Sequence, residues 1–193
     1  MQIFSMLRGV ALLALLQAAE AAVVSLQRHS LEDLVVSTSS GELQGTVKDT
    51  APHVRQFLGI PYAQSPVGDL RFQPPAAYAA DGDARDASAY GPSCLQPGSS
   101  SLTALYDKYM PEFLPGSTEQ SEDCLFLNVY APAGAAQEKR PVFVFIPGGA
   151  FATGGANVPY AIPDQWVERT QEMVIVTIKL AIPASRATGM DIY

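Results

Sequence analysis

The sequence contains little of what several classes of protein need. It has only two cysteines and two histidines, and 12 basic residues against 19 acidic ones give a formal net charge of −7. The basic residues are scattered, whereas nucleic acids and anionic membrane surfaces need a concentrated positive patch. The histidines and cysteines are too far apart in the chain for metal-ligand spacing. We therefore expect no nucleic-acid partner and no metal site.

A hydrophobic run long enough to span a membrane is also missing. The apolar run at residues 10–19 has about ten residues, whereas a span needs roughly 20. Arg8 precedes it, and Ala19-Glu20-Ala21 offers a small-x-small cleavage site. This pattern predicts a signal peptide over residues 1–21 and a secreted mature chain. The alternative is a buried N-terminal helix.

Cys94 and Cys124 are the only cysteines, so they pair with each other if they pair within the chain. An oxidising compartment favours a disulfide between them, while two free buried thiols are the alternative. The disulfide would close a turn-rich loop of about 29 residues, which in the chain-entropy model stabilises the fold by roughly 3–4 kcal/mol.

Short extended segments make up the first part of the chain. Residues 34–47 predict a strand, a turn and a second strand, and residues 54–60 predict another strand that stops at Pro61. Residues 62–123 have mostly loop composition, with one helical turn expected within residues 102–109. A loop region this long in a domain is usually functional.

After residue 124 the pattern becomes that of an α/β protein. Residues 125–130 and 173–178 predict strands, and the continuously apolar residues 142–146 predict a strand buried on both faces. We expect the strand at 173–178 to lie at the edge of the sheet. A helix is predicted over residues 164–172, opened by Pro163, with Trp166 and Val167 on its inner side.

A glycine loop, residues 147–155, links the strand at 142–146 to this helix. Strand, loop, helix and strand together form a βαβ unit, which begins a mostly parallel sheet. Glycines at the end of a buried strand let backbone N–H groups face a ligand. Two such N–H groups can stabilise an oxyanion during acyl transfer, although a plain tight turn explains the glycines equally well. The Gly-Lys-Ser/Thr ending of a phosphate loop is absent, and no cofactor is predicted.

Four further segments of the sequence all resemble the same protein family. Residues 122–132 (Glu-Asp-Cys-Leu-Phe-Leu-Asn-Val-Tyr-Ala-Pro) closely resemble the signature of type-B carboxylesterases, the family of the cholinesterases and secreted fungal lipases. Residues 41–45, 57–63 and 66–72 resemble the opening segments of the same family, in the same order. The resemblance implies an α/β fold, namely the N-terminal part of an α/β-hydrolase, in which small antiparallel strands lead into a mostly parallel sheet that is incomplete here.

The resemblance also implies a function for the glycine loop. Members of the family cleave carboxylic esters with a Ser–His–acid triad, and their two oxyanion-hole donors match Gly149 and Ala150, with Gly148 as the supporting position. The residue before the glycines is often His or Tyr in the family. Here it is Pro147, which offers no side-chain hydrogen bond and is given no catalytic role.

The disulfide loop has a counterpart in the family as well. The first disulfide of the family matches Cys94–Cys124, and its loop would border the entrance of the active site. Tyr106, Tyr109 and Phe113 would then line a substrate gorge. Ordinary packing of the loop onto the body of the domain is the alternative for each of these aromatic residues.

The catalytic triad itself is not in the sequence. No Gly-x-Ser-x-Gly pentapeptide is present, and the only histidines, His29 and His53, precede the βαβ unit and do not match the family's base. We expect both to be surface residues. Without a nucleophile and a base, the chain as given carries part of the oxyanion hole and is expected to be inactive.

The resemblance continues to Ile178 and then stops. The family pattern goes on with an Asn-Tyr-Arg-Leu-Gly type of segment, whereas this chain continues from Lys179 with an unrelated tail. The predicted organisation is therefore a signal peptide (1–21), the N-terminal part of a type-B carboxylesterase domain (22–178) and a divergent tail (179–193).

Two readings of function remain at this stage. The first is a fragment of a secreted esterase or lipase that acts on an ester or lipid-like small molecule. The second is a cholinesterase-like binding or adhesion protein that keeps the fold without the triad, and a short secreted form that binds without turnover belongs to the same class. The residue at the family's serine position would separate them.

Overall fold

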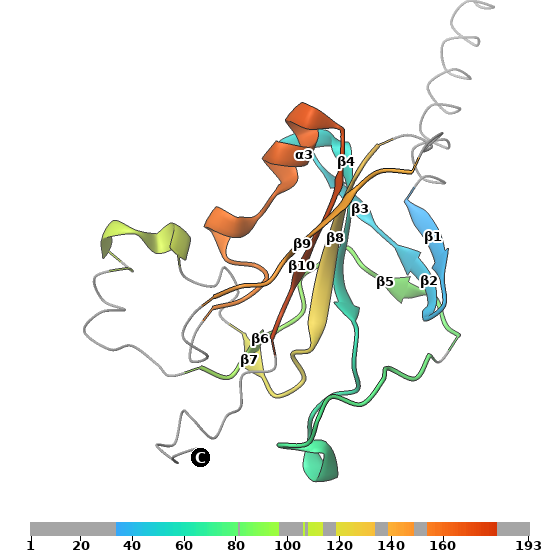
Figure 1. Ribbon diagram of the computed structural model, residues 1–193, viewed down its shortest axis with the longest axis vertical. Coiled ribbons are helices and arrows are strands. Elements are labelled where there is room, and N and C mark those ends of the chain that lie inside the picture. Colours follow the sequence, from blue (N-terminus) through green and yellow to red (C-terminus); the bar gives the residue numbers. More distant parts are fainter. Residues whose placement is uncertain are drawn as a thin grey trace, which may run out of the picture.

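A five-stranded sheet forms the body of the molecule (Figure 1). The computed structural model describes the following residues: 34–80, 82–96, 106, 108–113, 119–133, 139–148 and 154–180. The strands of the main sheet are, in spatial order, β3 (Thr46–Lys48), β4 (Ala51–Pro61), β8 (Phe126–Pro132), β10 (Val174–Ile178) and β9 (Val142–Phe145).

The direction of the strands changes across this sheet. The pairs β3–β4, β4–β8 and β8–β10 are antiparallel, whereas β10 and β9 run parallel. Antiparallel strands therefore lead into a parallel pair, in the order that the sequence predicts.

Two smaller sheets lie beside the main one. The strand–turn–strand predicted at residues 34–47 is confirmed in part: β1 (Val35–Thr38) pairs antiparallel with β2 (Gly41–Gln44). The second predicted strand, residues 43–47, is divided at Gly45 between β2 and β3, which lie in different sheets. β5 (Arg85–Asp86) then adds to β2 in parallel. Within the predicted loop region, β6 (Ser93–Cys94) pairs with β7 (Gln120–Ser121).

The predicted helix is α3 (Asp164–Thr170), and it ends two residues early because Gln171 has a left-handed φ of 54°. Val167 is buried as expected, but Trp166 is 48% exposed, so its predicted inner position is wrong. α3 joins the parallel strands β9 and β10, which confirms the βαβ unit. Short 3-10 helices lie at Gly68–Leu70, Pro111–Phe113 and Pro159–Ala161. Residues 106, 108 and 109 are helical, which agrees with the helical turn expected there.

The two faces of the sheet are covered by different elements. On one face Val167 of α3 joins a buried cluster with Val54, Leu58 and Ile175. On the other face Leu43 of β2 packs with Phe57 of β4. Strands β4 and β8 therefore lie inside a layered core, with α3 on one side and the small sheet on the other.

The strand at residues 142–146 was expected to be buried on both faces, and this expectation is wrong. Val142 is 61% exposed, Val144 51% and Ile146 63%. β9 is the edge of the main sheet, and its one neighbour there is β10. An all-apolar sequence makes a strand suitable for burial, but burial also requires elements that cover it.

The expectation that residues 173–178 form an open edge is also wrong. β10 lies between β8 and β9 and pairs with both. Ile175 and Thr177 are consequently buried. β9 lies outside β10 because β10 pairs antiparallel with β8 on one side and parallel with β9 on the other.

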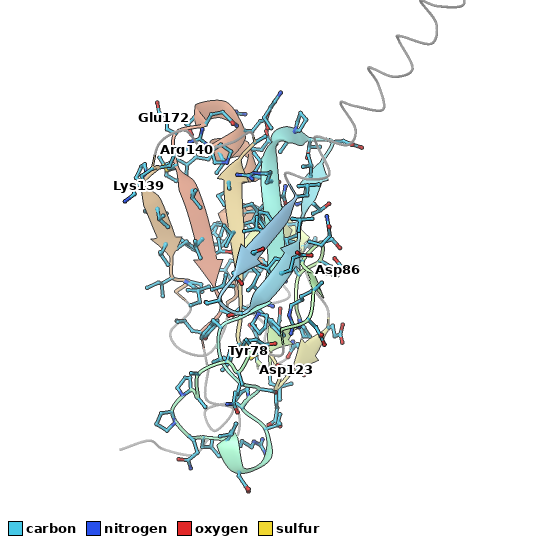
Figure 2. All side chains as sticks on the ribbon, turned by 90° about the vertical axis from the view of Figure 1, so that its right-hand side faces the viewer. Tyr78, Asp86, Asp123, Lys139, Arg140 and Glu172 are labelled. Carbon is cyan, nitrogen blue, oxygen red and sulfur yellow. A yellow bond between two sulfur atoms is a disulfide. The ribbon has the colours of Figure 1, made fainter. Side chains whose placement is uncertain are left out.

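The two ends of the sheet differ in what surrounds them. Figure 2 shows Lys139, Arg140 and Glu172 at the end where β9 and β10 begin, and Asp123 towards the opposite end, to which both strands point. Asp123 precedes Cys124, so the disulfide and the glycine loop share the carboxyl end of the parallel strands. The predicted signal peptide (1–21) and residues 181–193 of the predicted tail lie outside the described residues.

Candidate active-site loop

The glycine loop begins where β9 ends, after Phe145. Pro147 is buried and Gly148 is exposed, and no atom of the described residues lies within 4 Å of the position that a Cβ would take at Gly148. The predicted oxyanion donors Gly149 and Ala150 lie outside the described residues, which resume at Gly154. The structure describes the two ends of the loop, residues 147–148 and 154–155.

These two ends lie against each other. Gly154 has a φ of +112°, and a Cβ at this position would come within 2.6 Å of the Gly148 carbonyl oxygen. A side chain at position 154 would clash with backbone and strain the residue, so glycine is required there. The loop therefore returns at Gly154 to the point at which it left Gly148.

A side chain from the disulfide loop contacts Gly154. The Nε2 of Gln96 donates to the Gly154 carbonyl oxygen at 2.7 Å, and the Gly154 N–H donates to Oε1 of Gln96 at 3.0 Å. Both backbone groups of Gly154 are thus bound by one side-chain amide. Sequence reasoning missed Gln96, and its place two residues after Cys94 was the only signal.

Side chains of the central strands bind the segment that follows the glycine loop, at Ala156. The carbonyl oxygen of Ala156 accepts a hydrogen bond from the Thr177 hydroxyl at 3.0 Å and a longer one from Asn128 Nδ2 at 3.4 Å. Asn128 also donates to the Thr177 oxygen at 3.0 Å and accepts from the Gly59 N–H at 3.0 Å. The buried Asn128 therefore joins β4, β8 and β10 to the chain just beyond the glycine loop. It lies within the signature segment, but its structural role was not predicted.

The predicted disulfide is present. The sulfurs of Cys94 and Cys124 are 2.06 Å apart, and their Cα atoms are separated by 5.0 Å. Both residues are buried in a cluster with Ala63 and Leu125, which lie at the ends of β4 and β8. The disulfide thus fixes the base of the loop that carries Gln96.

The predicted gorge aromatics pack partly against one another. Phe113 stacks on Tyr160 with ring centroids 4.7 Å apart, and Tyr106 lies 6.2 Å from Phe113. Tyr109 is exposed. For Phe113 these contacts are of the ordinary packing type, and the lining of a gorge stays a prediction for all three residues.

His53 contacts α3 and is not among the described partners of the glycine loop. His53 is exposed on β4, where its Nδ1 lies 2.6 Å from Oε1 of Glu168 and its backbone N–H donates to Oε2 at 2.8 Å. This contact fastens β4 to α3, and the neighbouring histidine holds the pKa of the Glu168 carboxyl below its ordinary value. The expected surface position of His53 is confirmed, while His29 lies outside the described residues.

A buried amine lies at the end of β10. Lys179 is 2% exposed, and its Nζ donates to the carbonyl oxygens of Gly91 and Pro92, near the ring of Phe126. Burial lowers the pKa of this lysine to about 8. Tyr62 donates its hydroxyl to the Lys179 carbonyl at 2.7 Å, and burial raises the pKa of that tyrosine.

The described residues offer neither a metal site nor a membrane-spanning helix. Among them, no group of three or more His, Cys, Asp or Glu side chains is arranged to hold a metal ion. Within the same ranges, no helix combines the length and the apolar character needed to cross a bilayer.

Comparison with known proteins identifies the family. A sequence model described as the carboxylesterase family matches residues 32–180. The chain belongs to this carboxylesterase family. The predicted family is thereby confirmed, and so is the fold class, because the solved structures that the chain resembles are carboxylesterases.

Individual relatives agree with this assignment. The carboxylesterase-family chain is 44% identical over 155 residues to a chlorogenic acid esterase of Aspergillus niger, a match that covers 78% of this chain and 30% of that protein. It is 32% identical over 170 residues to secreted lipase 5 of Gibberella zeae, covering 76% of this chain and 30% of that protein. The crystal structure of carboxylesterase EST55 from Geobacillus stearothermophilus superimposes with a TM-score of 0.58 at 32% identity, covering 76% of this chain and 26% of that one. The matched region therefore spans less than a third of each of these relatives.

Proposed function

We propose that this chain is the N-terminal part of a secreted carboxylic ester hydrolase of the serine esterase or lipase type. The observation that carries the proposal is the glycine loop at the carboxyl end of β9, in a chain that belongs to the carboxylesterase family. Backbone N–H groups presented by such a loop are suited to stabilise the oxyanion of acyl transfer.

In this proposal Gly149 and Ala150 donate to the oxyanion, and Gly148 supports them. The exposed Gly148 supports this role, because the space beside it is open on the side where a Cβ would lie. The contact between Gly148 and Gly154 supports it as well, since donors act best when the surrounding backbone is already in place.

The chain as given is proposed to be inactive. An oxyanion hole stabilises a transition state only when a nucleophile generates it, and the sequence contains no Gly-x-Ser-x-Gly elbow. His53 is engaged with Glu168 on α3. The nucleophile, the base and the acid would have to come from sequence that this chain does not contain.

The substrate class and the compartment belong to the same proposal. We propose an ester or lipid-like small molecule as substrate for a longer product that carries the triad. Secretion, with removal of residues 1–21, is supported by the short N-terminal apolar run and by the Cys94–Cys124 disulfide, which is typical of an oxidising compartment.

Residues 179–193 are proposed to be a tail outside the family pattern. Lys179 supports this, because it places an ammonium group at a buried position where no carboxylate among the described residues pairs with it. Burial of a charged amine without a carboxylate is costly, so a lysine is a poor choice for this site. The family match itself continues to residue 180.

Two measurements test the proposal. The first is to sequence the full transcript across the codon for Ile178. A product that continues into an Asn-Tyr-Arg-like segment and a Gly-x-Ser-x-Gly supports the esterase. Reads that join Ile178 directly to the present tail contradict the proposal about residues 179–193.

The second measurement is an assay of the purified 193-residue chain with p-nitrophenyl esters of short and long acyl chains. We expect no hydrolysis above the buffer rate, whereas a longer product with the triad should show saturable turnover. Saturable turnover by the 193-residue chain would overturn the proposed inactivity.

A binding or adhesion protein is the second candidate function. The sequence fits this candidate and the esterase almost equally, because the residue at the family's serine position, which would separate them, is not among the 193 residues given. A longer transcript in which another residue replaces the serine would support this candidate over the esterase.

A further inference from the structure

We propose that Gln96 is a positioning residue for the glycine loop, and through it for the backbone donors of the oxyanion hole. The inference rests on the proposed function for its catalytic meaning. Its structural part, the fixing of Gly154 by Gln96, can be tested separately.

The geometry of the contact is that of a peptide group pairing with a strand. A side-chain amide offers one acceptor and a donor in one plane. Gln96 uses both on a single residue, donating to the Gly154 carbonyl oxygen at 2.7 Å and accepting from the Gly154 N–H at 3.0 Å. One side chain therefore restricts both the position and the rotation of the Gly154 backbone.

Fixing Gly154 also restricts the start of the loop. The Gly148 carbonyl oxygen lies so close to Gly154 that even a Cβ at 154 would meet it at 2.6 Å. The Gly148 backbone therefore limits how far Gly154 can move towards that side. The two residues enclose the segment that contains Gly149 and Ala150, so Gln96 acts on the frame in which the predicted donors are held.

Gln96 is itself well anchored. Its backbone N–H donates to Oε1 of Gln120 at 3.0 Å, and Cys94, two residues earlier, is bonded to Cys124. Ser93 pairs with β7 as well, since its N–H donates to the Glu119 carbonyl oxygen at 3.0 Å. The disulfide, the β6–β7 pair and the Gln96 amide thus form a continuous connection to the glycine loop.

The consequence for catalysis follows from what an oxyanion hole requires. Its donors must be aligned before the charge develops, and a misplacement of about 1 Å can lower the rate by roughly 100-fold. Gln96 contacts backbone in this structure, at Gly154. Its loss should therefore lower kcat and leave KM nearly unchanged, because ground-state binding does not depend on the oxyanion donors.

The experiment compares amide hydrogen exchange at Gly154 in three variants of the 193-residue chain. Gln96→Ala removes both hydrogen bonds and should speed exchange at Gly154 by about 10-fold, the value of one ordinary hydrogen bond. Gln64→Ala is the matched control, since the side chain of Gln64 also donates to a backbone carbonyl, that of Ala77, at a different place. It should leave Gly154 unchanged.

Gln96→Leu separates hydrogen bonding from a general loss of packing. Leucine keeps most of the side-chain volume but can neither accept from the Gly154 N–H nor donate to the Gly154 carbonyl. It should speed exchange at Gly154 by about 10-fold, as Gln96→Ala does. A change caused by lost packing alone would appear in Gln96→Ala and not in Gln96→Leu.

The outcomes are distinct. Unchanged exchange at Gly154 in Gln96→Ala overturns the inference, whatever the activity. If that variant does not fold, Gln96→Leu decides, and exchange at Gly154 that is unchanged in Gln96→Leu overturns the inference. In a longer product that hydrolyses esters, Gln96→Ala should lower kcat by about 10- to 100-fold with KM within about twofold, as a lost transition-state interaction does. A longer product carrying the triad that hydrolyses no ester contradicts the proposed function and leaves the exchange result at Gly154 standing.

Discussion

Strands β8 and β9 are both short and apolar, and both pair with β10, yet their surroundings differ. β8 pairs with β4 on its other side and carries fully buried residues such as Tyr130 and Asn128. Among the described residues, β9 pairs with β10 alone, and Val142 and Val144 are exposed. The comparison shows that neighbours, and not composition, decide which apolar strand becomes core.

The difference has a physical consequence for each strand. The core around β8 is formed by packing from α3 and the small sheet, and by the disulfide cluster at its start. In the part of the chain that the structure describes, the outer edge of β9 has no strand paired to it and carries exposed apolar side chains, an arrangement that promotes pairing with other chains. Perturbations near β8 should therefore lower the free energy of unfolding, whereas those in β9 should not.

The largest effect is expected from the disulfide at the start of β8. Cys94→Ser together with Cys124→Ser frees a loop of about 30 residues and should lower the free energy of unfolding by about 3–4 kcal/mol. Urea denaturation of the two proteins in the absence of reductant measures this. Equal stability would show that the covered region does not depend on the crosslink.

The next largest effect on the free energy of unfolding is expected at Lys179. This residue directly follows β10, the strand that lies between β8 and β9. Burial lowers its pKa from 10.5 to about 8 in the folded chain. Between these two values the unfolded chain holds a proton that the folded chain has released, so the free energy of unfolding should rise with pH, by at most about 3 kcal/mol. Below about pH 8 both states are protonated, and Lys179 adds no pH dependence.

Urea denaturation at pH 7.5, 8.5 and 9.5 measures this rise. The control is Lys179→Met, which keeps the length of the side chain but cannot titrate. Parallel pH profiles for the two proteins would contradict the buried position of the amine.

A matched pair of valines tests the comparison most directly. Val54 on β4 is fully buried, whereas Val144 on β9 is about half exposed. Val54→Ala should lower the free energy of unfolding by about 2 kcal/mol through lost burial and a small cavity. Val144→Ala should change it by no more than about 0.5 kcal/mol. Equal losses, measured by chemical denaturation, would mean that β9 is covered in solution.

The smallest effect is expected at the contact that fastens α3 over β4. His53 lowers the pKa of the Glu168 carboxyl. The stabilisation is therefore present above the ordinary pKa of a glutamate and is lost as the pH falls through the lowered value. Glu168→Gln should remove this acid-dependent part of the stability. Glu172→Gln, at an exposed position beyond the end of α3, is the control, and equal acid profiles for both variants would contradict the role of the pair.

Much of the local structure could be predicted from the sequence. Alternation and turn residues located β1 and β2, the proline and the apolar spacing located α3, and the two cysteines left one intramolecular pairing. The signature at residues 122–132 led to the family and the fold. Each of these depends on short-range chemistry or on a motif that is complete within a few residues.

The site was predictable only in part for the same reason. The glycines at 148 and 149 and the alanine at 150 stand in one motif and could be named. The partners of the loop could not, because Gln96 lies 58 positions before Gly154 and Asn128 lies 28 before Ala156. Hydrogen bonds over such separations leave no periodic pattern in the sequence.

The sequence by itself determined the family, the disulfide partner choice, the βαβ unit and the lack of a nucleophile elbow, since all of these are written in residue identity and near spacing. Only the tertiary structure decided that β10 is internal while β9 is the edge, that Trp166 faces outward, and that Gln96 reaches the glycine loop. The physical reason is that burial and side-chain hydrogen bonding depend on which distant segments become neighbours. The order of the strands and the path of the chain between them determine those neighbours, and amino-acid composition does not.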